Sequence, residues 1–235
     1  MGDELIILAL TAASIGFLHT ALGPDHYLPF IAMSKAGKWS KKKTLTVTAL
    51  SGVGHVLGSV LLGIIGIAAG IALVNLEAVE SVRGEIAAWL LISFGFIYFV
   101  WGVKNAVGNK KHEHWHSHAD GAFHSHLHKH SDEHSHVHQK EKSLTPWVIF
   151  IIFVFGPCEA LIPLLMFPAS KVSLGGLILV VSIFGITTIF TMLSVVFVSL
   201  YGIDFLKFGK LEKYGSALAG IIIMMSGVAV QFIGL

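Results

Sequence analysis

The residues of this chain best suited to bind an ion lie in one short stretch, HTALGPDHYLPF, which begins at His19. It places two imidazoles and one carboxylate, those of His19, Asp25 and His26, at the end of an apolar segment, and His55 adds a third imidazole in the next one. Imidazole suits nickel, cobalt, zinc and copper, whereas carboxylates alone suit magnesium, calcium or manganese. These four side chains therefore predict a site for a first-row transition metal.

The spacing of the histidines sets a geometric condition on this site. In an unbroken helix, His19 and His26 would lie about 10.5 Å apart along the axis, which is too far for one ion with bonds near 2 Å. Gly23 and Pro24 predict a break that folds the two imidazoles together. Without the break, the two histidines would serve successive sites along a path, or His19 would be only a neighbour. His55 alone is equally well explained as an interhelical hydrogen-bond partner.

A second motif, GPCEALIPL, begins at Gly156 and is similar to GPDHYLPF at Gly23. Each proline in a helix displaces the backbone carbonyl one turn earlier, which then becomes available to a cation. Cys158 is a candidate soft ligand here, although a lone cysteine is more often a packing residue. Glu159 is a candidate ligand or, equally, a proton-coupling acid.

The polar residues downstream of the two motifs also correspond. His55 lies 32 residues after Gly23, and Thr188 lies 32 residues after Gly156. Thr187 and Thr188 are therefore candidates to line the same path from the second half, with helix packing as the alternative.

The composition is that of a membrane protein, because 54% of the 235 residues are hydrophobic and only 13% are charged. A crossing helix needs about 20 apolar residues, and six stretches qualify: 4–34, 44–74, 86–107, 147–168, 173–201 and 214–235. We predict an all-α polytopic membrane protein with six transmembrane helices. Because three spans are an odd number, residues 1–107 and 147–235 form two inverted three-helix repeats, each with a proline-broken first helix.

A histidine-rich loop over residues 108–146 separates the two predicted repeats. Eleven of the fourteen histidines lie in it. With few apolar residues to support a core, the loop is predicted to be disordered without metal and to offer many weak, exchangeable metal sites. The loop histidines expected to buffer metal are His112, His114, His116, His118, His124, His126, His128, His130, His134, His136 and His138.

Charge in the connections predicts an orientation. The stretch KAGKWSKKK holds five lysines between Lys35 and Lys43, whereas the next connection, NLEAVESVRGE (75–85), has three glutamates and one arginine. By the positive-inside rule the first loop is cytoplasmic. The histidine-rich loop is then cytoplasmic as well, and both termini lie outside.

The motif GFLHTALGPDH, with His55 in the next apolar segment, resembles the nickel/cobalt transporter family, which includes NicO and UreH-like proteins of the LysE superfamily. GPCEALIPL resembles the second-half motif of the same superfamily. The resemblance implies a six-span inverted-repeat transporter of Ni²⁺ or Co²⁺ in a prokaryotic cytoplasmic (inner) membrane. It also places His19, Asp25 and His26 on the metal-selecting motif, although the spacer before Asp25 has five residues where the uptake branch usually has four.

The function expected from these features is secondary transport of a divalent transition metal, Ni²⁺ or Co²⁺ first, with Zn²⁺ also fitting. A cytoplasmic histidine-rich loop suits export, so efflux is favoured over uptake. The alternative is a non-transporting membrane chaperone that hands metal to an enzyme. We expect no enzymatic activity, because the single cysteine cannot form a thiol relay. No prosthetic group and no nucleic acid are expected; the candidate partners are the lipid bilayer, a cytoplasmic metal chaperone and a second copy of the chain.

Overall fold

A computed structural model of the chain describes seven stretches of backbone. They are residues 2–108, 112–117, 123–128, 144–158, 160–165, 174–204 and 209–234. Apart from one short hairpin, the described chain is helical.

The first half consists of a broken helix followed by two long ones. Helix α1 (Gly2–Leu22) ends before Gly23, a 3-10 turn η1 (Pro24–His26) follows, and α2 (Leu28–Ala36) continues the segment. Next come α3 (Lys41–Ala68) and α4 (Leu73–Val107). The predicted break at Gly23 and Pro24 is confirmed, since proline lacks the N–H that would continue the helix.

The second half also begins with a broken helix. Helix α5 (Thr145–Phe155) stops before Gly156 and Pro157, and the chain is helical again over residues 161–165. Helix α7 (Leu174–Asp204), a 3-10 turn η2 (Gly209–Tyr214) and helix α8 (Gly215–Ile233) complete it.

Within the described residues, five helices are long and apolar enough to cross a membrane: α1, α3, α4, α7 and α8. This number agrees with an integral membrane protein. The fourth predicted stretch, 147–168, is not among them, because only eleven helical residues precede the break that Pro157 imposes.

The prediction that residues 75–85 form a connection is wrong. They belong to α4, which is 35 residues long and begins at Leu73. The glutamates suggested a solvated loop, but Glu80 is completely buried and bonds to Arg83 one turn later. A charge on a helix is tolerated in the interior when it is paired in this way.

Part of the histidine-rich loop forms a hairpin, so the prediction of disorder does not hold there. Strand β1 (His112–Ser117) pairs antiparallel with β2 (Phe123–His128). The register places histidine opposite histidine at three positions, 112 with 128, 114 with 126 and 116 with 124.

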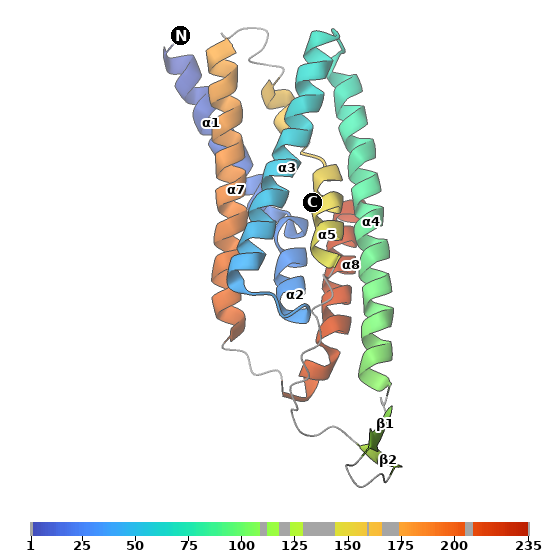
Figure 1. The fold of residues 1–235 in the computed structure, drawn as a ribbon. Helices are drawn as coiled ribbons and strands as arrows, with labels where there is room; N and C mark the ends of the chain where they lie inside the picture. The colour runs from blue at the N-terminus through green and yellow to red at the C-terminus, as the bar shows by residue number, and fades with distance from the viewer. Residues whose placement is uncertain are drawn as a thin grey trace.

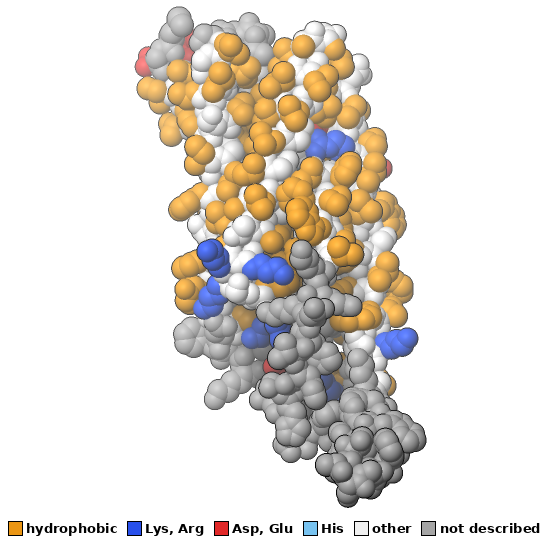
Figure 2. Space-filling view, viewed as in Figure 1, with side chains coloured by type: hydrophobic (Ala, Val, Ile, Leu, Met, Phe, Trp, Pro, Cys, Tyr) orange, Lys and Arg blue, Asp and Glu red, His pale blue; other side chains and the backbone are white. Residues whose placement is uncertain are grey.

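The helices pack in pairs that join the two halves (Figure 1). Helix α4 lies along α8, α1 lies along α7, and α3 contacts both α5 and α7. Hydrophobic side chains cover the outside of this bundle, and most of the Lys and Arg side chains on the visible face gather toward the end where α3 begins (Figure 2). The surface is that expected of helices surrounded by lipid.

Glycines bring α4 and α8 into backbone contact. A Cβ atom on Gly95 would lie 2.4 Å from the backbone nitrogen of Met224, and one on Gly220 would lie 2.3 Å from that of Phe99. Small residues that allow backbones to approach are the usual basis of helix association in membranes.

We therefore expect Gly220→Ala to force α4 and α8 apart and to destabilise the fold by about 1–3 kcal/mol, as overpacking does. The thermal unfolding midpoint of the purified protein in detergent measures this. Gly202→Ala is the matched control, because a Cβ on this α7 glycine meets nothing within 4 Å. Equal midpoints for the two variants would contradict the proposed close contact.

Candidate metal site

Three histidines from different elements converge inside the bundle. His19 comes from the last turn of α1, His26 from η1 and His55 from the middle of α3. Each offers a ring nitrogen, and the three nitrogens lie within 4.8 Å of one another. The ring centroids of His19 and His26 are 4.7 Å apart, and those of His26 and His55 are 5.2 Å apart. We call these three residues the histidine triad.

The break after α1 brings His19 and His26 together. The Gly23 N–H donates to the His19 carbonyl at 3.0 Å, and the His26 N–H donates back to the Gly23 carbonyl at 3.1 Å, so the chain turns tightly. A Cβ on Gly23 would lie 2.6 Å from His26 Nδ1 and 3.0 Å from Asp25 Oδ1. Glycine is needed here because a larger residue would occupy the space of the imidazole.

Asp25 orients His26 and is not one of the three converging groups. Its Oδ1 lies 3.0 Å from His26 Nδ1. An ionised carboxylate can only accept, so Nδ1 donates the proton and Nε2 keeps its lone pair. A carboxylate that fixes the tautomer of a histidine in this way is the usual outer partner of a metal ligand.

Several ring nitrogens of the triad are available to coordinate an ion. Among the described residues, His19 Nε2, His26 Nε2 and both ring nitrogens of His55 are buried without a hydrogen-bond partner. Each such group costs about 1–3 kcal/mol. With metal–nitrogen bonds of about 2.0–2.1 Å, the ligands of a tetrahedral ion lie about 3.4 Å apart, so small side-chain rotations would close the triad on one ion.

Aromatic and backbone groups enclose the triad. The Phe153 ring, at the end of α5, lies 5.8 Å from the His26 ring and 5.2 Å from the His55 ring, centroid to centroid. A cavity of about 20 Å³ beside His55 is lined by Asp25, Phe153 and Gly156, among others. Such a volume holds about one water molecule or one ion.

The other described site candidates are not members of the converging group. Cys158 is completely buried and packs in an apolar cluster with Val56 and Leu161. Thr188 is also buried, beside Gly16 at the contact of α1 with α7, while Thr187 is only half-buried.

Several predicted residues are outside what the structure describes. Glu159 lies outside the described residues, as do His118, His130, His134, His136 and His138. The backbone of His112, His114, His116, His124, His126 and His128 belongs to the hairpin.

Sequence reasoning missed a polar stripe on α3. Its members are completely or almost completely buried and follow helical spacing: Thr44, Thr48, Ser51, His55 and Ser59. Intervals of four, three, four and four residues put them on one face of the helix. The intervals are visible in the sequence and could have identified the buried face of α3.

It also missed the pair of Glu80 and Arg83, which it placed in a connection. The charges of the stretch did not reveal the pair, because its glutamates look like those of a solvated loop. A periodic set of apolar residues that continues from 86 back to 73 is the only available hint.

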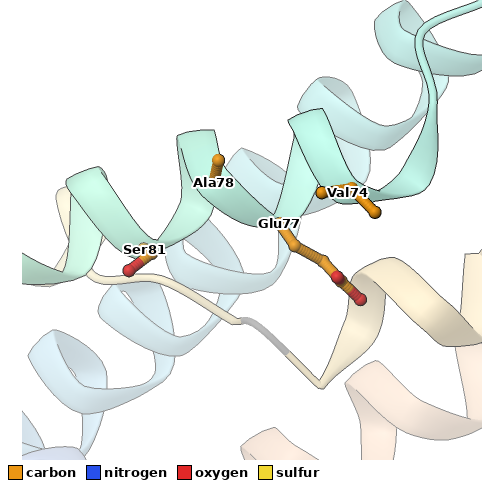
Figure 3. Close-up of a pocket in the computed structure, with 4 residues that line it drawn as sticks. All are labelled: Val74, Glu77, Ala78 and Ser81. Carbon is orange, nitrogen blue, oxygen red and sulfur yellow. The ribbon is translucent and has the colours of Figure 1, made fainter.

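A wider pocket lies at the start of α4, lined by Val74, Glu77, Ala78 and Ser81 (Figure 3). Glu77 contributes the single carboxylate of this lining, and its side chain is exposed. One exposed carboxylate is too little to bind a transition metal, so the triad is the better candidate.

Comparison of the chain with protein-family models, with curated proteins and with solved structures found no match. The functional argument therefore depends on the geometry of the site.

Gly23→Ala should weaken metal binding at the triad by about tenfold or more, because the added methyl displaces His26 and Asp25 and outer-shell changes of this kind cost 10–100-fold. The measurement is Ni²⁺ titration of the detergent-purified protein, taken as the difference from the same chain carrying His26→Ala. This subtraction removes binding by the histidine-rich loop. Gly202→Ala is again the control, and a Gly23→Ala chain that binds as tightly as this control would contradict the packing described.

Proposed function

We propose that the protein is a secondary transporter of divalent transition-metal cations, Ni²⁺ or Co²⁺ first, and that the histidine triad binds the transported ion. The observation that carries this proposal is the convergence of three imidazoles with unpartnered nitrogens inside a lipid-facing bundle. Ionisable groups at membrane depth are costly and usually mark an ion pathway. Because metal requires the unprotonated imidazole, binding should weaken as the pH falls below the ordinary histidine range.

The position of the triad supports transport over surface binding. His55 lies about 21 Å from the start of α3, halfway along a helix of about 42 Å, given a rise of 1.5 Å per residue. Both helix breaks lie next to the triad, since Gly23 is beside His26 and Gly156 is beside His55. Broken helices that meet near the midplane are typical of secondary transporters.

The six-span inverted repeat is part of the proposal. Helices α1 and α5 each begin a half, each ends at a Gly-Pro break, and the two run in opposite directions through the bundle (Figure 1). Helix α1 of the first half contacts α7 of the second, and α5 of the second half contacts α3 of the first. These two contacts correspond to each other in an inverted repeat. In this arrangement α5 and the helical residues 161–165 together form the fourth span.

The polar stripe of α3 suits an ion path between the triad and the lysine-rich end of the bundle, where α3 begins. Ser51 lies one turn before His55, is fully buried and has no hydrogen-bond partner among the described residues, while Thr44 donates to Ser34 Oγ at 3.0 Å. By the positive-inside rule, the lysines favour a cytoplasmic location for this end of the bundle, which would leave both termini outside. Export from the cytoplasm is the favoured direction.

Metal flux into proteoliposomes tests the proposal. The intact chain should move Ni²⁺ or Co²⁺ faster than Mn²⁺, and His26→Ala and His55→Ala should each lower the flux at least tenfold, because two imidazoles hold the ion poorly. His112→Ala, which removes one of eleven loop imidazoles, is the matched control and should leave the flux unchanged. If flux persisted in both triad variants, the triad would not be the transport site.

The alternative function is a non-transporting accessory protein that hands metal to an enzyme. The hairpin favours it, since its backbone register puts histidine opposite histidine at three positions. Deletion of residues 112–138 separates the two. A transporter should keep its flux with an altered apparent affinity for metal, whereas an accessory protein should lose its ability to activate the recipient metalloenzyme.

A further inference from the structure

The break in the second half is bridged by a buried ion pair that the proposed transport site does not include. Arg83, the only arginine of the chain, and Glu80 lie one turn apart on α4. The Glu80 side chain is completely buried, and that of Arg83 is 19% exposed. Arg83 Nη1 donates to Glu80 Oε1 and, at 3.4 Å, to Ser59 Oγ.

The arginine bonds the chain just before the break. Its Nη2 donates to the carbonyls of Val154 at 3.2 Å and Gly156 at 3.3 Å. The final carbonyls of a helix have no partner within the helix, and Pro157 cannot donate to any of them. The guanidinium supplies the missing donors, and it is therefore the cation that occupies these carbonyls.

The glutamate bonds the chain just after the break. The Cys158 N–H points at two acceptors, Glu80 Oε2 at 3.3 Å and Ser59 Oγ at 3.2 Å. One ion pair thus holds the backbone on both sides of Pro157. Gly58 leaves the space for it, because a Cβ there would lie 2.9 Å from Arg83 Nη2.

The same break forms the wall against which His55 lies. A Cβ on Gly156 would be 3.3 Å from His55 Nδ1, and the Phe153 ring packs on the His55 ring. Ser59, which the pair contacts directly, is one turn after His55 on the same face of α3. The ion pair therefore bonds both the backbone beside His55, at the Gly156–Pro157 break, and Ser59, on the α3 face that carries His55.

We propose that Glu80 and Arg83 are positioning residues that hold the Gly156–Pro157 break against His55 and so set the geometry of metal binding at the triad. This inference rests on the proposed function, because it assigns a role relative to the bound metal. Neither residue touches the metal. They act on it through Gly156, Phe153 and Ser59.

Replacing both charges by apolar residues separates positioning from stability. Removing one partner of a buried pair leaves an unpaired charge, but replacing the whole pair by hydrophobic residues of similar size is often neutral or stabilising. Glu80→Leu/Arg83→Met should therefore fold with an unfolding midpoint close to that of the unaltered chain. It loses the ion pair's hydrogen bonds to Val154, Gly156 and Cys158, while the Cys158 N–H keeps its bond to Ser59 Oγ.

The readout is Co²⁺ bound to the full-length protein in detergent, with the visible absorption of Co²⁺ reporting ligand geometry. Each spectrum and titration is taken as the difference from the same chain with His26→Ala, which cancels binding by the loop. We expect the double variant to bind Co²⁺ about 10–100-fold more weakly than the unaltered chain and with a shifted absorption band. Glu77→Leu, an exposed position one turn before Glu80, is the control and should change neither.

The outcomes distinguish the two claims. A folded double variant with unchanged affinity and spectrum overturns the positioning role and leaves the proposed function standing. Absence of any His26-dependent Co²⁺ band in the unaltered chain overturns both. If the double variant fails to fold, Arg83→Lys decides: it keeps the charge but cannot bond two carbonyls, a serine and a carboxylate at once, so unchanged Co²⁺ binding in it overturns the inference.

Discussion

The need to satisfy polar groups away from water is the constraint on which this structure depends. In a lipid-facing bundle, every backbone or side-chain donor and acceptor must find a partner inside the protein. The chain breaks two of its helices at Gly-Pro pairs and so creates unsatisfied groups where they are most costly. How each break is compensated determines what that part of the molecule can do.

The two breaks are compensated differently. At the first break, Asp25 pairs with one nitrogen of His26. In the part of the chain that the structure describes, the other nitrogen has no partner, and neither do nearby nitrogens of His19 and His55. At the second break, Arg83 and Glu80 bond the backbone on both sides. The first break thus carries the nitrogens that we propose bind the transported cation, while the second is bonded by a cation that belongs to the protein, Arg83.

The break at Gly23 and the helical nature of the chain could be predicted from the sequence, because proline chemistry and long apolar runs are local signals. The gathering of His19 and His26 followed from that break. His55 was predicted to join them, but the sequence left an interhelical hydrogen bond equally open, since the position of His55 beside His26 depends on tertiary packing. The second half was less predictable. The prediction of a cation near the freed carbonyls did not foresee that Arg83 would supply it, because charged residues in 75–85 are typical of a loop.

Cys158 illustrates the limit of reasoning from motif similarity. Its position matches that of Asp25 in the aligned Gly-Pro motifs, yet its side chain lies in an apolar cluster and its backbone N–H bonds the ion pair. Similar motifs predicted similar breaks correctly, but the side chains around each break depend on the neighbouring helices.

X-ray absorption at the metal edge tests the central claim most directly. The sample is the full-length chain with all eleven loop histidines replaced by asparagine, loaded with one equivalent of Ni²⁺ or Co²⁺, so that His19, His26 and His55 are its only imidazoles. We predict one tightly held ion per chain whose scattering shows three imidazole ligands. A metal that binds with oxygen ligands alone, or that fails to bind stoichiometrically, would contradict the account.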